Sequence, residues 1–361
     1  MRRLLRALVI LLVVMAVAAG VAVNVVLGRL DQPYKGYGEA ERLLDIPPRT
    51  TVAEIGRQLV EAGVVSDPYL FRIALWRSGT ESLQAGEYLF AEEALIAEVI
   101  DRLARGDVFT RRLTFPEGLT IADMAQIYEA QGFGIEEDFV RAAQDARLIA
   151  DLDPEATDLE GYLFPETYQL ARHDTAAVLV RAMVERFKVV FTDDLRGRAE
   201  AAGFTARQAV ALAAIVEKEA GASDERPLVA AVYRNRLRIG MPMQADPTVI
   251  YALQKTGTYD GNIRRTDLAF DSPYNTYRYG GLTPGPIAAP GEASLVAALS
   301  PADVPYLYFV SRNDGTHAFA RTLAEHNSNV RRFQVEYFRR RRQATRSAIA
   351  LPKTSEADGR E

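Results

Sequence analysis

Two glutamates stand at the end of a segment whose other residues suit a protein interior. Residues 209–216 are apolar without interruption, and Glu217 and Glu219 lie just beyond them. Thr205 and Gln208 have the spacing of a capping box, which marks the start of a helix. Because the apolar run leaves no polar face, the sequence predicts a buried helix with carboxyl groups at its C-terminal end.

Such carboxyl groups are suited to general acid catalysis. Burial and the negative end of the helix dipole both disfavour the ionised form, so a glutamate placed there stays protonated near neutral pH. Positions i and i+2 are about 200° apart on a helix, so Glu217 and Glu219 face opposite ways and cannot form a close dyad. Periodicity leaves open which one is the acid. It also leaves open a structural alternative, with one glutamate buried in an ion pair and the other solvated.

Composition excludes several other kinds of chemistry. The chain of 361 residues has no cysteine, and its three histidines are not in metal-ligand spacing. It contains no phosphate-binding or dinucleotide-binding fingerprint. We therefore expect no metal and no cofactor. Residues 1–30 hold four arginines and no acid, which leaves 39 basic and 48 acidic residues in the remainder. A body with a charge of −9 is not expected to bind nucleic acid.

The N-terminal segment predicts a transmembrane helix over residues 7–28. Its 22 residues include one polar side chain, Asn24, and a helix of that length just spans a hydrocarbon core of about 30 Å. A cleaved signal peptide is the alternative, although its apolar region is ordinarily about 7–15 residues long. Arg2, Arg3 and Arg6 predict a cytoplasmic N-terminus over residues 1–6, with the rest of the chain outside.

An internal repeat follows the N-terminal segment. Residues 46–55 match residues 115–124 at an offset of 69, which indicates a duplicated unit that we predict as strand, helix, helix, strand. Thr51 and Thr120 are the expected helix N-caps, with a reciprocal capping box at the first of them alone. The single tryptophan, Trp76, lies in the first unit. We expect it in the core, with a sugar-stacking surface as the alternative.

Eight motifs in order resemble one known family. They are EGYLFPETY at 160–168, IVEKEA at 215–220, SDER at 223–226, YRNRLRIGM at 233–241, QADPTVIY at 244–251, SPYNTY at 272–277, GLTPGPI at 281–287 and PYLYFV at 305–310. This set resembles the endolytic murein transglycosylases, the MltG or YceG-like family. The βααβ order of residues 44–109 is similar to a LysM module, a small carbohydrate-binding fold, and a packed spacer domain is the alternative.

The resemblance implies an α+β enzyme anchored in the cell (inner) membrane, with its catalytic domain periplasmic or extracytoplasmic. Such a lyase cleaves the MurNAc–GlcNAc bond within nascent peptidoglycan strands and leaves 1,6-anhydro-MurNAc ends. The resemblance places the acid/base residue at Glu219 and leaves Glu217 as a supporting residue that pairs with an arginine. It also implies an association with peptidoglycan synthases of the elongation or division machinery.

A sugar-binding cleft needs hydrogen-bonding groups and aromatic faces. We predict that two segments line it, through Gln244, Asp246, Thr248, Tyr274, Asn275, Thr276 and Tyr277. Loop packing is the alternative for the tyrosines. Asp246 is the second carboxylate if the reaction is hydrolysis, and its alternative role is to cap the helix that Pro247 begins.

The predicted layout has six parts: a cytoplasmic N-terminus (1–6), a transmembrane helix (7–28), a linker (29–43), a LysM-like domain (44–109), a YceG-like catalytic domain (110–345) and a disordered tail (346–361). Two other functions stay open at this stage. One is a peptidoglycan hydrolase that uses Glu219 with Asp246. The other is an anchored wall-binding scaffold without catalysis.

Overall fold

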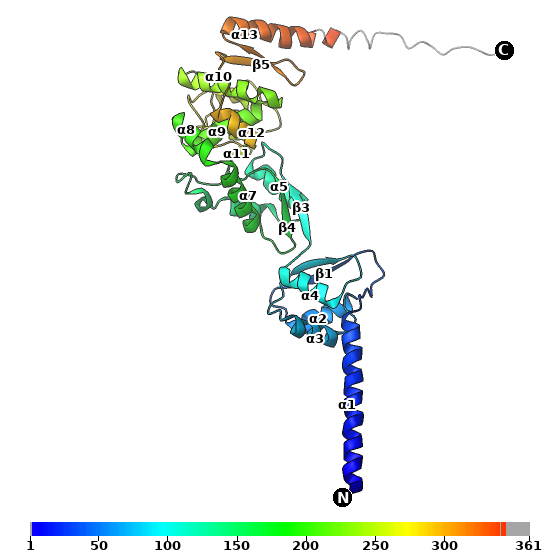
Figure 1. The fold of residues 1–361 in the computed structure, drawn as a ribbon. Helices are drawn as coiled ribbons and strands as arrows, with labels where there is room; N and C mark the ends of the chain where they lie inside the picture. Colours follow the sequence, from blue (N-terminus) through cyan, green and yellow to red (C-terminus); the bar gives the residue numbers. More distant parts are fainter. Residues whose placement is uncertain (1, 340, 344–361) are drawn as a thin grey trace, which may run out of the picture. The chain divides into compact units, whose positions relative to one another are not determined.

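The computed structural model describes residues 2–339 and 341–343, so the predicted tail lies outside the described residues (Figure 1). The chain divides into two compact units, Met1–Arg112 with Gln169–Asp174 and Leu113–Tyr168 with Thr175–Glu361. Helices and short antiparallel strand pairs make up both units. The predicted α+β class is confirmed, whereas the likeness of residues 44–109 to a LysM module stays a prediction.

The first unit begins with the long helix α1 (Arg2–Leu30). Its segment Leu5–Leu30 is long and apolar enough to cross a membrane, by length and composition. The C-terminal end of α1 is part of the unit's core, because Leu30 is buried there and Val26 packs against the same cluster. The helix therefore runs directly into the folded unit.

A two-stranded antiparallel sheet and three helices complete the first unit. They are β1 (Arg42–Ile46), paired with β2 (Gly86–Phe90), and α2 (Val52–Glu61), α3 (Pro68–Ser78) and α4 (Ile96–Arg105). The predicted order of strand, helix, helix, strand is confirmed for this unit. Residues 31–41, within the predicted linker, lie against it: Tyr34 forms a β-bridge with Ala94, and Tyr37 is buried.

The position of Trp76 differs from the prediction. Helix α3 buries Leu70 and Phe71 and half-buries Ala74 and Leu75. Trp76 lies on the opposite side of the helix and is 84% exposed. The expected core position is therefore wrong, because the inward face of α3 is already filled by smaller side chains.

The second copy of the repeat has the same order of elements, and its two helices belong to the second unit. Strand β3 (Thr110–Thr114), helix α5 (Ile121–Ala130), helix α6 (Glu136–Ala143) and strand β4 (Thr167–Ala171) follow in the same order, and β3 pairs with β4. Helices α2 and α5 begin 69 residues apart. Gly63 and Gly132, which follow them, share a left-handed φ of 71° and 72°. The duplicated unit is therefore confirmed at the level of its elements and turns.

The capping boxes are distributed differently from the prediction. At Thr120 the box is reciprocal, because the Asp123 carboxylate accepts the Thr120 backbone N–H at 3.0 Å. At Thr51 only the forward bond forms, from the Glu54 N–H to the threonine hydroxyl. The Glu54 carboxylate turns away to pair with Arg57. The prediction of a box at Thr51 alone is wrong, because an ion pair competes for the longer side chain.

The second unit is built around α9 (Ala206–Glu219). Helix α9 contacts α8 (Asp193–Ala201), α10 (Arg226–Arg238), α11 (Asp246–Lys255) and α12 (Glu292–Leu299), and these helices lie together in Figure 1. The remaining elements are η1 (Ala146–Ile149), α7 (Ala176–Val190), η2 (Ser223–Glu225), η3 (Asp267–Ala269), β5 (Tyr308–Ser311), β6 (His317–Ala320), α13 (Leu323–Val330) and the π-helical η4 (Arg331–Glu336). Strands β5 and β6 pair antiparallel as a hairpin.

Two glycines of this unit differ in their surroundings and so test its packing. Gly161 has a φ of 82°, and a Cβ there would meet the Pro286 side chain at 2.3 Å. Gly203 has a φ of 75° with open space around it. We expect Gly203→Ala to lower the free energy of unfolding by about 1 kcal/mol through left-handed backbone strain alone. Gly161→Ala should lower it by about 2–4 kcal/mol, because overpacking adds to the strain.

Scanning calorimetry of the detergent-solubilised full chain measures both effects. At about 2–4 °C per kcal/mol for a unit of this size, the two variants should be clearly separated. Equal losses would show that Pro286 does not constrain Gly161.

Candidate active site

Helix α9 brings Glu219 to the end of a fully buried stretch. Residues 209–216 are all buried, as their composition predicted, and Thr205 and Gln208 form the expected reciprocal capping box. Glu219 is the last helical residue, and Ala220 already has an extended backbone. The helix therefore ends where its polar residues begin, and it presents the Glu219 carboxyl group at that boundary.

The surroundings of Glu219 favour its protonated form. Burial, with the charge of Asp246 as a smaller contribution, raises the pKa of this carboxyl group to about 7. A hydrogen bond from the Tyr233 hydroxyl to Glu219 Oε1, 3.1 Å long, and the charge of Arg236 act in the opposite direction. Glu219 itself remains partly exposed. It can therefore hold a proton near neutral pH and pass it to a bound molecule.

Tyr233 and Arg236 lie one turn apart on α10, and our sequence reasoning did not nominate them. Tyr233 is buried, with its ring against the edge of Phe309 at 5.8 Å between centroids. Arg236 donates from Nε to the Leu307 carbonyl at 2.7 Å and from Nη1 to the Met243 carbonyl. Their i, i+3 spacing is the signal for a shared helix face, but only the tertiary contacts bring that face to Glu219.

Asp246 and Tyr277 belong to the same cluster of groups. The Tyr277 hydroxyl donates to Asp246 Oδ1 at 2.5 Å, and burial together with this bond raises the pKa of Tyr277. Asp246 is exposed and is the first residue of α11, whose N-cap is Ala245. The alternative that Asp246 caps this helix is therefore wrong. Its carboxylate is available to solvent or to a ligand.

Gln244 is exposed beside this cluster in an unusual backbone conformation. Its φ is 51°, and its backbone N–H donates to the Thr276 carbonyl at 3.3 Å. A residue other than glycine in the left-handed region stores about 1–3 kcal/mol of strain, and such residues gather at functional sites. The hydrogen bond to Thr276 therefore helps to hold the Gln244 backbone in this conformation, and the side-chain amide of Gln244 remains exposed.

Three of the predicted cleft residues are buried inside the protein. Thr248 and Thr276 join their hydroxyl groups at 2.9 Å, and Asn275 donates to the carbonyl groups of Leu268 and Phe270. Their exposed fractions are 0–1%, which leaves no surface for a ligand. We therefore revise their role from substrate contact to the support of the Asp246 and Tyr277 segments.

Tyr274 contacts two residues that line a cavity of about 610 Å³. Its ring packs on Tyr251 at 5.0 Å and beneath the ammonium group of Lys255, and both of these residues line that cavity. Glu160 lines it as well, and burial raises its pKa to about 8. The Glu160 carboxyl group accepts the Ile121 N–H and the Tyr251 hydroxyl, each at 3.2 Å. Glu160 therefore ties α5 to α11.

Glu217 points away from this site, as the helix geometry predicted. Its Oε1 lies 3.3 Å from Arg226 Nη2, and its Oε2 accepts the Gly291 N–H at 3.1 Å. The Glu217 side chain is 7% exposed. Arg226 also pairs with Glu117, whose pKa is raised by burial and by the Glu217 charge. The arginine pair expected for a supporting residue is present.

The β5–β6 hairpin holds the segment that follows Glu219. His317 Nδ1 lies 2.7 Å from Glu225 Oε2, and the His317 backbone N–H donates to Oε1 at 2.9 Å. A Cβ on Gly221 would meet the Gly315 carbonyl oxygen at 2.8 Å. His317 is thus a structural residue that ties the hairpin to Glu225.

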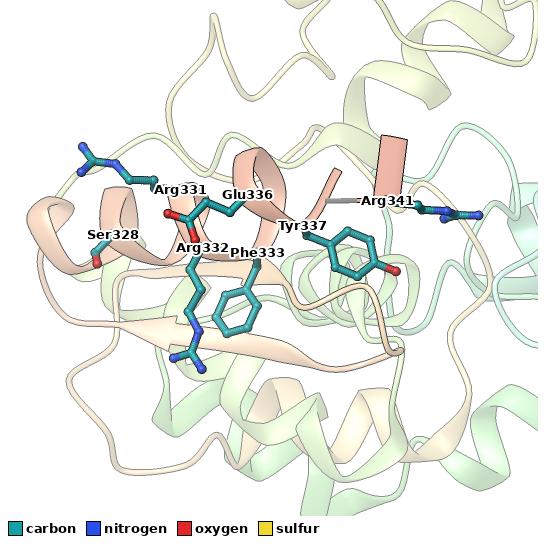
Figure 2. Close-up of a pocket in the computed structure, with 7 residues that line it drawn as sticks. All are labelled: Ser328, Arg331, Arg332, Phe333, Glu336, Tyr337 and Arg341. Atoms are coloured by element: carbon teal, nitrogen blue, oxygen red, sulfur yellow. The ribbon is translucent and has the colours of Figure 1, made fainter. Parts of the chain in front are cut away.

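Another cavity, of about 830 Å³, lies along α13 and η4 and contains none of the predicted site residues. Figure 2 shows that the side chains of Arg331, Arg332 and Arg341 point in different directions. They do not converge on one point in the way that a binding site for a small ligand requires.

Fold and site together define an α+β protein that presents a partly exposed glutamate with a raised pKa at the end of a buried helix. This is the arrangement of a protein with an acid–base site. The YceG-like family model matches residues 44–332, and the chain belongs to this family.

Relatives with known names support this assignment. The chain is 30% identical over 300 residues to the endolytic murein transglycosylase of Bacillus subtilis, covering 79% of this chain and 82% of that protein. It is 28% identical over 320 residues to the endolytic murein transglycosylase of Streptococcus pneumoniae R6, where it spans 57% of the relative's length and 79% of its own. A crystal structure of a YceG-like protein from Listeria monocytogenes matches with a TM-score of 0.55 and 28% identity, covering 81% of this chain and 99% of that one.

The two neighbouring glutamates should affect stability in opposite directions. The folded-state pKa of Glu219, about 7, exceeds its ordinary value of 4.5, so its protonated form stabilises the fold below pH 4.5. That stabilisation is lost as pH rises through 7. Glu219→Gln cannot ionise, and it should raise the free energy of unfolding at pH 8 by about 1–3 kcal/mol. Glu217→Gln should lower it by about 1–3 kcal/mol, because Arg226 loses a buried partner.

Unfolding of the full chain in detergent at pH 5 and pH 8 checks both signs. The gain from Glu219→Gln should shrink toward zero at the lower pH. If Glu219→Gln destabilised the protein at pH 8, the carboxylate would not be desolvated as described.

Proposed function

We propose that this protein is a membrane-anchored lytic transglycosylase that cleaves peptidoglycan glycan strands internally, with Glu219 as the acid and base. The observation that carries the proposal is the position of Glu219: partly exposed, at the end of a buried helix, with a pKa raised to about 7. The names of the relatives from Bacillus subtilis and Streptococcus pneumoniae supply the reaction class.

In the first step, protonated Glu219 donates its proton to the oxygen that joins MurNAc C1 to GlcNAc. The C1–O bond breaks, its electron pair stays on the departing oxygen, and positive charge develops at C1. In the second step, the Glu219 carboxylate accepts the proton of the MurNAc 6-hydroxyl, and O6 bonds to C1. The product is a 1,6-anhydro end, no water is consumed, and Glu219 is protonated again.

A single carboxyl group is sufficient for this reaction. The nucleophile belongs to the substrate, so its orientation is largely set before the bond breaks. The Tyr233 hydroxyl and the charge of Arg236 stabilise the Glu219 anion between the two steps. The substrate's own acetamido group can stabilise the positive charge at C1. The Asp246–Tyr277 pair and the Gln244 amide are groups for binding sugar hydroxyls.

Helix α1 supports the proposed location. The candidate span Leu5–Leu30 and the arginines that precede it favour a single-pass anchor with a cytoplasmic N-terminus. The remainder of the chain then lies outside the cell membrane, where nascent glycan strands are made. The LysM-like first domain, the predicted domain boundaries and the association with synthases are parts of this proposal that follow from the resemblance.

Hydrolysis of the same strands is the second candidate. The exposed Asp246 carboxylate lies close enough to Glu219 to raise its pKa, and it could activate a water molecule. Mass spectrometry of the products distinguishes the two reactions. A lytic reaction leaves anhydro-MurNAc ends, and hydrolysis leaves reducing ends.

Glu219→Gln should abolish the formation of anhydro-MurNAc ends by the full chain acting on purified glycan strands. Positioned acid catalysis accounts for about 10²–10⁴ in rate, so the loss should be at least in that range. Glu185→Gln makes the same change at an exposed residue of α7 and should retain full activity. Cleavage by Glu219→Gln at the rate of the unmodified chain would rule out this residue. Strand binding without cleavage by both variants and the parent would indicate a scaffold.

The pH dependence of kcat/KM should move in opposite directions in two variants. The activity of the unmodified protein should fall as pH rises through about 7, because the acid loses its proton. Tyr233→Phe removes a hydrogen bond to the carboxylate, so the alkaline limb should move to higher pH. Asp246→Asn removes a repelling charge, so the limb should move to lower pH.

Tyr279→Phe is the control, because this exposed tyrosine bonds to Asp271, away from the Glu219 cluster. Its profile should match that of the unmodified protein. Shifts of Tyr233→Phe and Asp246→Asn in the same direction would refute the electrostatic account of the site.

A further inference from the structure

One face of α3 carries large side chains that the fold leaves uncovered. Tyr69, Ile73 and Trp76 are 70%, 39% and 84% exposed. Their spacing of i, i+4 and i+7 places them on one side of the helix. Arg72 and Arg77 are exposed on the same side, and within the described part of the chain neither is paired with a carboxylate. We call these five residues the α3 face.

Helix α3, which carries this face, lies beside the C-terminal end of α1. Helices α1 and α3 contact each other, and Val26 and Leu30 of α1 pack into the core of the first unit. Figure 1 shows α3 on the side of this unit where α1 enters, with β1 on the other side. The α3 face is therefore exposed at the level where the apolar part of α1 ends.

The length of α1 determines what surrounds that level. A hydrocarbon core of about 30 Å takes up about 20 helical residues. Counted from Ala7, which follows the last N-terminal arginine, that length is used up near Val26. Val26 already packs against the folded unit, so no free linker separates the unit from the membrane surface. A helix that contacts α1 at this point lies in the lipid headgroup layer.

We propose that the α3 face inserts into the headgroup layer of the outer leaflet and fixes the first unit on the bilayer surface. Tyrosine and tryptophan are enriched at this depth because an apolar ring and a polar group are both accommodated there. The two arginines supply the charges that pair with lipid phosphates. The inference rests on the proposed anchor and adds a second membrane contact to it.

The single tryptophan of the chain makes the proposal directly measurable. The full chain is reconstituted into vesicles of phosphatidylethanolamine and phosphatidylglycerol. Quenching of Trp76 fluorescence is then measured with iodide in the aqueous phase and with brominated lipids in the bilayer. Aqueous iodide should quench it severalfold less than it quenches the free amino-acid analogue. Lipids brominated near the headgroup should quench it, whereas lipids brominated at the end of the acyl chain should quench it weakly.

A matched control uses the other side of the same unit. In the Trp76→Phe, Leu43→Trp variant the reporter lies on β1, where Leu43 is 49% exposed. Iodide should quench this reporter freely, and brominated lipids should not. Free iodide access to Trp76 in vesicles, equal to that of the Leu43→Trp reporter, would overturn the proposal.

Two further measurements separate the competing explanations. Washing the vesicles with alkaline carbonate tests the α1 anchor by itself. A chain that is washed off refutes the anchor. A chain that stays on the vesicles while iodide reaches Trp76 freely refutes the α3 contact alone. Soluble glycan strands are added to the chain in detergent. If they protect Trp76 from iodide while vesicles do not, the α3 face is a sugar-binding surface and the membrane proposal is wrong.

Discussion

The chemistry of this protein depends on one constraint, the burial of α9 up to the residue before its polar end. Eight consecutive apolar side chains are removed from water, which stabilises the second unit by about 25 cal/mol for each Å² of apolar surface. The helix cannot shift without exposing that surface. Its last residue, Glu219, is therefore held at the boundary between core and solvent, where the ionised carboxyl group is poorly solvated and the proton is retained.

Helical geometry then gives two adjacent glutamates different roles. Glu217 turns toward α12 and is neutralised by Arg226, so it ties the helix to the chain around Gly291. Glu219 faces α10, where the Tyr233 hydroxyl and the charge of Arg236 favour its anion and the charge of Asp246 opposes it. These influences partly oppose one another, and their balance leaves the pKa of Glu219 near neutrality. A full ion pair in place of these opposing influences would have held Glu219 in its charged form.

The two copies of the βααβ repeat share a local sequence pattern but have different neighbours in the structure. Both copies keep a first helix of ten residues, the left-handed glycine that follows it and the pairing of the two outer strands. The helix and the glycine turn depend on residues close together in the chain. The outer faces of the two copies differ. In the first copy α3 leaves an aromatic and basic surface uncovered. In the second copy the loop after α6 carries Glu160, which is tied to Ile121 of α5 and to Tyr251 of α11.

The sequence by itself determined the features that depend on local chemistry. The buried helix, the opposite directions of Glu217 and Glu219, the repeat and the apolar N-terminal helix follow from periodicity and capping, which act within a few residues. Tertiary structure alone decided which polar groups meet Glu219. Tyr233 and Arg236 are brought there by the packing of α10 on α9, whereas Thr248, Asn275 and Thr276 are drawn into the core. Tertiary structure also left Trp76 outside. The physical reason is that the burial of a side chain depends on how elements far apart in the sequence pack together. A local sequence pattern does not contain that information.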